Sequence, residues 1–180
     1  MTTLCRRCSN DDEFAKVSLF FLENRRDLHL SYTTMDTISL LYSYLTQGHL
    51  LQATDADNRV IGVLAYYQGT PEEEFKDKEV AFADMVIFDK AHRGTRLFIT
   101  GLRFWVREIV KEHPEVQELR FAALEENEYL CKLYSKFSET SNRREGMLGK
   151  ELVFCVKINQ IRTILKNFRQ GIIRKKKTKD

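Results

Sequence analysis

The sequence has few of the residues that would divide it into separate parts. Of its 180 residues only two are proline, Pro71 and Pro114, and eight are glycine, so no flexible linker separates two halves. At this length a single domain with its own hydrophobic core is expected. The chain also has no apolar run long enough to span a bilayer, and residues 1–8 lack the apolar stretch of a signal peptide. These absences predict a cytoplasmic protein.

Cysteine and histidine are too few and too scattered to predict a metal centre. Of the four cysteines, only Cys5 and Cys8 form a C-x-x-C pair, which is half of a structural zinc site. Cys131 and Cys155 fall in apolar, periodic segments, where a free cysteine behaves as a small core residue. The four histidines form no H-x-x-x-H pair. We therefore expect no metal and no zinc-hydrolase chemistry.

The charged residues are numerous but nearly balanced. Charged residues make up 31% of the chain and hydrophobic residues 43%, with a formal net charge of +3, as is typical of a globular domain. Much of the positive charge lies between Arg174 and Lys179, and the rest of the chain is close to neutral, which argues against a dedicated nucleic-acid-binding fold. We interpret residues 172–180 as a solvated basic tail after a domain at 1–171. Binding of the tail to nucleic acid or to an acidic partner is the alternative.

Hydrophobic periodicity and turn residues predict two helices in the first half of the chain. Asn10 begins the first, with its side chain as the cap and Glu13 reaching back to the Asn10 amide. The second has Thr33 or Thr34 at its start and Gly48 at its end. Its core-facing stripe is predicted to be Ile38, Leu41, Tyr42 and Leu45.

Strands alternate with helices through the rest of the chain. The predicted strands cover residues 2–8, 49–54, 60–67, 79–88, 119–123 and 151–156, and the second and third of them form an antiparallel hairpin. The remaining helices are predicted at residues 96–111, 127–138 and 161–168. This order mixes hairpins with crossover helices, so it predicts a mixed α/β (α+β) domain with helices on both faces of one sheet.

The connection between the strand ending at Phe88 and the next helix is the strongest candidate for chemistry. A loop that runs into a helix start directs several backbone N–H groups at one point, and the helix dipole adds partial positive charge there. Gly94 permits a tight turn, and Lys90, Arg93 and Arg96 add charge, which suits a phosphate or pyrophosphate. An ordinary turn with exposed basic residues is the alternative, because neither G-x-x-x-x-G-K-[ST] nor G-x-G-x-x-G is present.

Three motifs follow one another in an order that is typical of one protein family. The first is the hairpin at 49–67, with Arg59-Val-Ile-Gly-Val63 in its second strand. The second is the strand–loop–helix at 80–110, in which Arg93-Gly94 matches the start of an R/Q-x-x-G-x-G/A signature. The third is Asn127 with Tyr134 seven residues later. Together they resemble the GNAT superfamily of acyl-CoA N-acyltransferases, which implies a central, mostly antiparallel sheet with helices on both faces.

The chain departs from the family pattern at two places. The two later small residues of the signature fall at Arg96 and Phe98, where the family's glycines let the helix start approach the CoA pyrophosphate. A side chain there would push the phosphate outward or weaken the site, unless Arg96 contacts a phosphate directly. The family's usual Gly-Phe after the tyrosine is Ser138-Glu139 in this chain.

The resemblance implies a role for each matching segment. Backbone groups of the strand at Val86 to Phe88 would bind the acyl carbonyl and the pantetheine arm, and amides from Gly94 to Phe98 would hold the pyrophosphate. The CoA-binding residues implied are Val86, Ile87, Phe88, Arg93, Gly94, Thr95, Arg96, Leu97, Phe98 and Asn127. Tyr134 would be the general acid that protonates the leaving thiolate, with a core aromatic as the alternative. Asn127 would contact pantetheine or cap its helix.

An amine nucleophile must lose a proton, so a base is also expected. Strand alternation puts Phe82, Asp84, Val86 and Phe88 on one face, where Asp84 is the ionisable group in an apolar strand. A carboxylate so placed has a raised pKa, which suits a base or a group that holds a cationic amine. A hydrogen-bonded structural aspartate is the alternative. Glu79 has the opposite parity and is a weaker candidate.

The sequence therefore predicts an N-acyltransferase that transfers an acetyl group from acetyl-CoA to a primary amine by direct attack in a ternary complex. A gap between the strands near Val86 and Phe121 would be its structural sign. The alternative is a GNAT-fold protein that uses an acyl-carrier donor or acts as a binding module, motivated by Arg96 and Phe98.

The partners of the reaction are less defined by the sequence. The acceptor is a small-molecule or protein amine, and its pocket would involve the first two helices. Tyr32, Tyr66 and Tyr67 would either line that pocket or pack in the core. No membrane partner is expected, nucleic acid is disfavoured, and a homodimer remains open.

Overall fold

The computed structural model of the chain describes residues 3–93, 96–146 and 148–177, with the side chains of residues 141 and 168–177 left out of the description. The strands are β1 (Leu4–Arg7), β2 (His49–Thr54), β3 (Val60–Gln68), β4 (Val80–Phe88), β5 (Glu118–Leu124), β6 (Glu139–Gly146) and β7 (Gly149–Lys157). The α-helices are α1 (Asp11–Leu28), α2 (Thr34–Gln47), α3 (Leu97–Glu112), α4 (Glu128–Tyr134) and α5 (Ile158–Lys177). Two 3-10 turns, η1 (Pro71–Glu73) and η2 (Lys90–His92), lie in the connections before and after β4.

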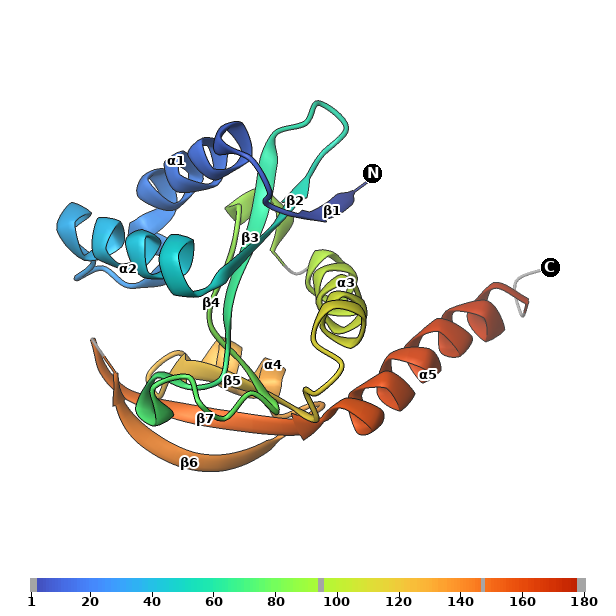
Figure 1. Cartoon of the computed structure of the whole chain (residues 1–180). Helices are drawn as coiled ribbons and strands as arrows, with labels where there is room; N and C mark the ends of the chain where they lie inside the picture. Colours follow the sequence, from blue (N-terminus) through green and yellow to red (C-terminus); the bar gives the residue numbers. More distant parts are fainter. Residues whose placement is uncertain (1–2, 94–95, 147, 178–180) are drawn as a thin grey trace.

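These strands form one sheet in the order β1-β2-β3-β4-β5-β7-β6. Neighbouring strands are antiparallel except β4 and β5, which are parallel and joined by the crossover through α3. Helices α1 and α2 cover one face of the β2–β4 part, and α3 covers the other (Figure 1). The predicted mixed α/β class, with a mostly antiparallel sheet and helices on both faces, is confirmed.

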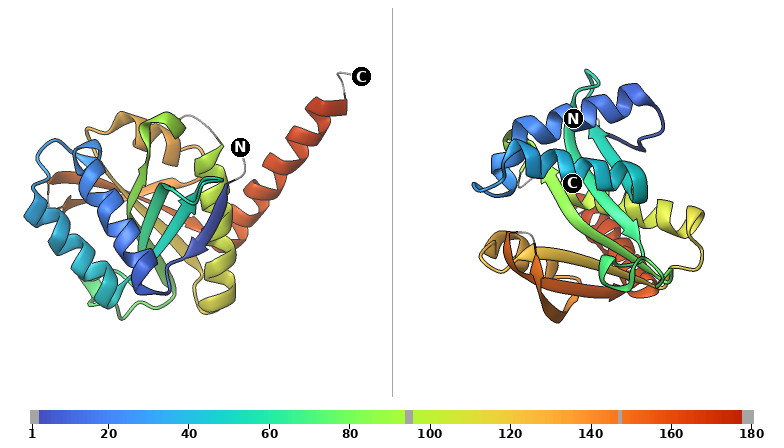
Figure 2. Two further views of the ribbon diagram at one scale, coloured as in Figure 1. Left: turned by 90° about the horizontal axis from the view of Figure 1, so that it is seen from above. Right: turned by 60° about the vertical axis from the view of Figure 1, so that its left-hand side comes forward.

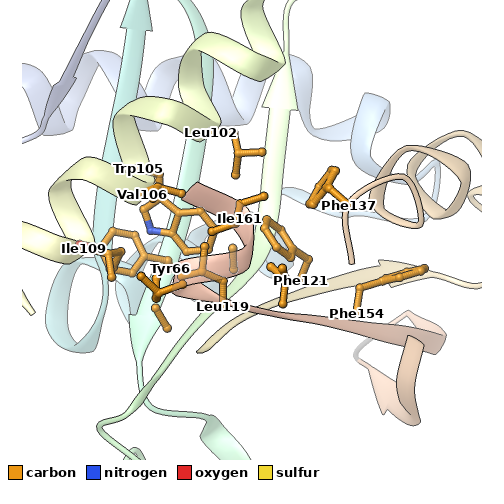
Figure 3. Packing of buried hydrophobic residues seen from close by; sticks show 14 of the residues in the cluster. Tyr66, Leu102, Trp105, Val106, Ile109, Leu119, Phe121, Phe137, Phe154 and Ile161 are labelled. Atoms are coloured by element: carbon orange, nitrogen blue, oxygen red, sulfur yellow. The ribbon is translucent and has the colours of Figure 1, made fainter. Parts of the chain in front are cut away.

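Each face of the sheet has its own buried cluster. On the α3 face, Trp105 packs against Tyr66 and Phe121, with ring centroids 5.6 and 5.3 Å apart, and α5 adds Ile161 (Figure 3). On the other face, Phe21 of α1 packs with residues of α2 and β4. Burial of large aromatic side chains on both faces holds β2–β4 as a rigid central layer.

The cap of α1 is partly as predicted. The Asn10 side chain accepts a hydrogen bond from the Glu13 N–H at 3.0 Å. The predicted return bond to the Asn10 amide is wrong, because the Glu13 carboxylate accepts from the N–H of Ser9 at 2.9 Å. Ser9 also offers its hydroxyl at 3.2 Å, so Glu13 satisfies two donors one residue further out. A complete capping box stands instead at α2, between Thr33 and Asp36.

Helix α2 ends at Gly48 as predicted, but it faces the core with a different side. Ile38, Tyr42 and Leu45 are 45%, 70% and 46% exposed, so the predicted stripe is wrong in three of its four members. The buried residues are Thr37, Leu41 and Tyr44. Both sides of this helix carry apolar residues, so periodicity alone does not fix its rotation. The rotation is fixed by Tyr44, whose ring packs on Tyr67 with centroids 5.2 Å apart.

One strand was not predicted from the sequence. Strand β6 lies at the edge of the sheet and pairs with β7 alone. Its sequence from Glu139 to Gly146 is almost entirely polar, because an edge strand with a solvated face needs few apolar residues. The helix predicted up to residue 138 ends at Tyr134 instead, and turns follow, in which the N–H groups of Phe137 and Ser138 donate to the Tyr134 carbonyl.

Helix α5 extends from the sheet and projects away from the rest of the molecule (Figure 2). Its first turns are anchored by Ile161 and Leu165 in the α3-side cluster. The helix runs to Lys177, past the predicted start of the basic tail at residue 172. None of the helices, as far as the chain is described, is both long and apolar enough to cross a membrane.

Candidate functional site

The sheet opens between β4 and β5, which are parallel to each other. Strands β4 and β5 pair from Val80↔Glu118 to Ala83↔Phe121. Beyond that point, β4 continues to pair with β3 up to Phe88, while β5 pairs with β7 up to Leu124. The second halves of β4 and β5 therefore diverge, as Figure 1 shows. This is the gap near Val86 and Phe121 that the sequence predicted, and it leaves backbone groups of β4 without a strand on that side.

A bulge in β4 changes the predicted alternation of side chains. While β3 advances two residues, from Ala65 to Tyr67, β4 advances three, from Met85 to Phe82. The extra residue lies at the start of the opening and reverses the parity of the strand after it. Asp84 therefore lies on the α1–α2 side, whereas Val86 contributes to a small cavity under α3. The prediction that Phe82, Asp84, Val86 and Phe88 share one face is wrong for this reason.

A cleft of about 490 Å³ follows the opening on the side of α3 and α4. Its lining residues are Asp27, Leu28, Val86, Ile87, Phe88, His92, Arg93, Phe98, Asn127, Tyr129, Leu130 and Leu133. Six predicted CoA-binding residues are thus brought together: Val86, Ile87, Phe88, Arg93, Phe98 and Asn127. The cleft has apolar walls near β4 and α4 and charged groups at the η2 end, which suits an extended, largely apolar arm with an anionic head.

The remaining predicted residues of this group lie elsewhere or are not described. Gly94 and Thr95 lie outside the described residues. Arg96 is the N-cap residue of α3, with no hydrogen bond from its side chain to the helix start. The Leu97 side chain is buried with Ala53 and Ile61, away from the cleft.

The basic residues at the η2 end already have an acidic partner. Asp27, near the end of α1, accepts from the Arg93 guanidinium and from Lys90 Nζ, each at 2.9 Å. Burial raises the pKa of the Asp27 carboxyl, but the two cations outweigh burial and hold this pKa below its usual value. The Arg93 Nε also donates to the Phe88 carbonyl at 3.1 Å. Sequence reasoning missed Asp27, because the pair joins residues that are 66 positions apart.

Phe98 is packed rather than exposed to the cleft as an isolated ring. Its centroid is 6.4 Å from that of Phe88, 6.2 Å from Tyr134 and 5.9 Å from Phe137. These contacts join the start of α3 to β4 and α4. The phenylalanine therefore stabilises the end of the cleft at which the family's signature has a small residue.

Tyr134 is a buried aromatic residue beneath the opening. It is 1% exposed, and its ring packs on Phe121 and Phe154 with centroids 5.1 and 5.7 Å apart. Burial raises the pKa of its hydroxyl above the ordinary value, so the group stays protonated at neutral pH. No hydrogen bond joins this hydroxyl to another described residue.

Asn127 caps α4, as one of the two predicted alternatives has it. Its side-chain oxygen accepts from the Leu130 N–H at 3.1 Å. The residue also lines the cleft.

Asp84 lies across the opening from the cleft, under α2. Its carboxylate accepts a hydrogen bond from the Tyr44 hydroxyl at 2.8 Å. Burial raises the pKa of Asp84 to about 6, against the lowering effects of Tyr44 and Arg144, while the charge of Glu151 adds to the rise. The predicted raised pKa is therefore present. Tyr44 and Arg144 were missed, since Tyr44 was not part of the predicted stripe of its helix and Arg144 lies in the strand that was not predicted.

Within the described ranges, no three His, Cys, Asp or Glu side chains are placed to hold a metal ion together. The four cysteines form no disulfide, and burial raises the pKa of the Cys8 thiol to about 12. The thiolate form that binds metals is therefore disfavoured at Cys8.

No protein-family model matches the sequence, and no curated protein matches it significantly. Solved structures do match the chain in fold. An aminoglycoside acetyltransferase in complex with coenzyme A and kanamycin is 18% identical, with a TM-score of 0.68 over 90% of this chain and 98% of that one. An acetyltransferase of the GNAT family from Staphylococcus aureus Mu50 is 9% identical, with a TM-score of 0.67 over 87% and 99% of the two chains.

A third similar structure is the ribosomal-protein-S5-alanine acetyltransferase from Vibrio fischeri. It is 12% identical, with a TM-score of 0.63 over 87% of this chain and 93% of that one. The likeness in each case is one of fold, and it covers nearly all of the other chain. The motifs in the sequence agree with the opened β4–β5 pair, with the order of the elements and with these similar structures. The chain therefore has the fold of the GNAT acyltransferase superfamily.

Proposed function

We propose that this protein is an N-acyltransferase that transfers an acetyl group from acetyl-CoA to a primary amine by direct attack in a ternary complex. The observation that carries the proposal is the opening between β4 and β5, with a cleft on one side and the Asp84 carboxylate on the other. A donor and an acceptor entering from opposite sides would meet at β4, where the backbone groups that face β5 have no partner strand. The fold likeness to an acetyltransferase that holds coenzyme A supports the choice of donor.

The donor side would be provided by backbone and by apolar side chains. Backbone N–H groups of Val86 to Phe88 would bind the acyl carbonyl and stabilise the oxyanion of the transition state. The walls at Leu130 and Leu133 suit the pantetheine arm. Arg93 and the start of α3 would meet the pyrophosphate, once the phosphate competes with Asp27 for the guanidinium.

The acceptor side would be provided by Asp84. An alkylamine reaches this site mainly as an ammonium ion, and the carboxylate would bind it and take one proton from it. With its pKa near 6, Asp84 is mostly ionised at neutral pH and is a stronger base than an ordinary aspartate. The amine nitrogen then bonds to the acyl carbon and the carbon–sulfur bond breaks. The Tyr134 hydroxyl gives its proton to the departing thiolate, and the second proton that the nitrogen loses on becoming an amide returns to the tyrosinate.

The test is binding followed by turnover. Coenzyme A at millimolar concentration should raise the melting temperature, since it binds the folded state alone. Thiol release from acetyl-CoA should then depend on an added amine, and D84N should lose most of this release while keeping the thermal shift. The absence of any thermal shift would overturn the proposal. The acceptors to try are small polyamines and aminoglycosides, such as the kanamycin held by the similar enzyme, and protein N-termini.

A second function is favoured by one specific arrangement. The Asp27 carboxylate neutralises Arg93 and Lys90, and Phe98 occupies the position of a small residue in the family signature. Both features weaken a pyrophosphate site, so the fold would then serve an acyl-carrier donor or a binding partner. Turnover with acylated carrier protein but not with acetyl-CoA would favour this function. The cytoplasmic location and the homodimer stay predictions in either case.

A further inference from the structure

Arg144 lies where three elements meet beside the acceptor side of the opening. From β6, its Nε is 2.7 Å from the Glu151 carboxylate in β7, and its Nη1 is 2.6 Å from Glu72 in η1. The guanidinium carbon lies 4.5 Å from the centroid of the Phe82 ring. The side chain is only 19% exposed. The guanidinium is thus held at two edges and one face, which fixes its position.

This position brings the Arg144 charge close to Asp84. Phe82, on which the guanidinium stacks, is two residues before Asp84 and lies in the α1–α2-side cluster with Tyr44, which bonds Asp84. The charge of Arg144 lowers the pKa of Asp84, and that of Glu151 raises it.

The other titratable groups that act on Asp84, or are acted on by it, are the phenols of Tyr32, Tyr44 and Tyr67. Burial raises the pKa of all three hydroxyls, so they are neutral near pH 7 and add no charge. The balance of charge around Asp84 is therefore between Arg144 and the Glu151 carboxylate that Arg144 itself binds.

We propose that Arg144 is a positioning residue for acyl transfer, which fixes the acceptor side of the opening and keeps the Asp84 carboxylate charged. The inference rests on the proposed role of Asp84 as the base. Without the guanidinium, the charge of Glu151 would act on Asp84 unopposed, and a like charge near a buried carboxyl favours the protonated acid. A protonated Asp84 neither binds an ammonium ion nor accepts its proton.

The geometry of the β6–β7 hairpin also helps to hold the Arg144–Glu151 ion pair in place. Gly146 pairs with Gly149 at the hairpin end. A Cβ at Gly146 would collide with the Glu151 carboxylate, so the glycine leaves the space in which Glu151 reaches Arg144. The position of the Arg144–Glu151 pair is therefore set by the backbone of the hairpin as well as by the attraction between the two charges.

The test follows the Asp84 carboxyl carbon by NMR during a pH titration, with D84N to assign the signal. R144Q should raise the midpoint by about one pH unit, the size typical for loss of a neighbouring arginine charge. E151Q should lower it, since a repelling charge is removed and Arg144 stays. R144K keeps the positive charge but not the stacked, two-edged contacts, so its midpoint should lie between those of R144Q and the wild type. A general loss of packing would not shift the Asp84 midpoint in opposite directions in R144Q and E151Q, whose wild-type residues form one ion pair.

The matched control is R143Q. Arg143 is the neighbouring residue of β6, 70% exposed and paired with Glu125 at 2.8 Å. It should leave the Asp84 midpoint unchanged, and in turnover assays only R144Q should move the rising limb of kcat/KM to higher pH. An unchanged midpoint in R144Q, or an equal shift in R143Q, would overturn the inference. If R144Q does not fold, the sign of the E151Q shift decides. Because the titration needs no turnover, it is separate from a failure of the proposed function.

Discussion

The guanidinium of Arg93 lies 2.9 Å from the carboxylate of Asp27, so a basic residue at the start of the crossover to α3 is bound by the end of α1. The Asp27 side chain is only 14% exposed, and it also binds Lys90. Any anion that enters this end of the cleft competes with a carboxylate that is already in place.

D27N should therefore strengthen binding of coenzyme A. The substitution releases two cations for phosphate. Because both cations reach solvent, their release should strengthen binding by no more than about 1 kcal/mol, which corresponds to roughly fivefold tighter binding. Titration calorimetry at two salt concentrations measures the gain, which should shrink at high salt. E126Q removes a nearby exposed charge paired with His29, and it should change the affinity little. Weaker binding by D27N would mean that Asp27 positions the loop for the ligand.

Y134F should slow turnover without unfolding the protein. The ring contacts with Phe98, Phe121 and Phe154 are kept, and no hydrogen bond to a described residue is lost. Loss of a general acid typically costs about 100-fold or more in rate. Steady-state kcat and the melting temperature are the two measurements. Y129F, in an exposed tyrosine of the same cleft, is the control, and equal rates for Y134F and wild type would remove Tyr134 from the mechanism.

The protein should lose stability in mild acid through a histidine pair. The rings of His49 and His113 are 5.1 Å apart, and His49 contacts the Arg7 guanidinium at 2.7 Å. Burial lowers the pKa of His49 to about 4 and also lowers that of His113. Near this pair lie Lys78, Glu108, Glu112 and Glu115.

The sign follows from proton binding. Between pH 6.5 and about 4 the unfolded chain binds a proton at His49 that the folded chain does not, so stability falls as the pH falls through this range. We expect a loss on the order of 2 kcal/mol, since solvent screens part of the effect. Chemical denaturation at pH 7.5 and 5 measures it. H49Q should flatten this dependence. A wild-type stability independent of pH would contradict the assignment.

Two glycines should respond in opposite ways to alanine. A Cβ at Gly101, in the middle of α3, meets no atom within 4 Å. G101A should therefore stabilise the protein by roughly 0.5–1 kcal/mol, the helix-propensity difference. At Gly62 a Cβ would lie 2.6 Å from the Phe88 ring, so G62A should destabilise the strand pair β3–β4. Melting temperatures of the two variants, compared with wild type, give the test, and a destabilised G101A would show that the space beside α3 is needed.

The parts of the fold that the sequence predicts are those fixed by local pattern. The hairpin at β2–β3, the apolar strand β4 and the long helix α3 each carry a periodicity that few other structures satisfy. The rotation of α2 depends instead on one tyrosine hydroxyl and a distant carboxylate. Strand β6 has no apolar signal at all, since its partner β7 supplies the pairing.

The candidate site divides in the same way. Residues of β4 and the loop after it are recognisable from motifs in sequence order. Asp27 binds Arg93 across 66 positions of the chain. Tyr44 and Arg144 act on Asp84 across 40 and 60 positions. The bulge in β4 is a property of its pairing with β3, so the face on which Val86 and Phe88 lie could not be read from β4 alone.

The short parallel pairing of β4 with β5 also has a consequence for how the chain folds. Strands β1–β4 and strands β5–β7 are each joined by antiparallel ladders, while the link between the two groups is the four-residue ladder from Val80 to Ala83. Closing that link requires the whole crossover through α3 to be in place, which carries a larger loop-closure entropy than any hairpin in the molecule. The hairpins β2–β3, β3–β4 and β6–β7 can therefore form early and independently, and the opening between β4 and β5 is assembled later, when α3 docks on the sheet.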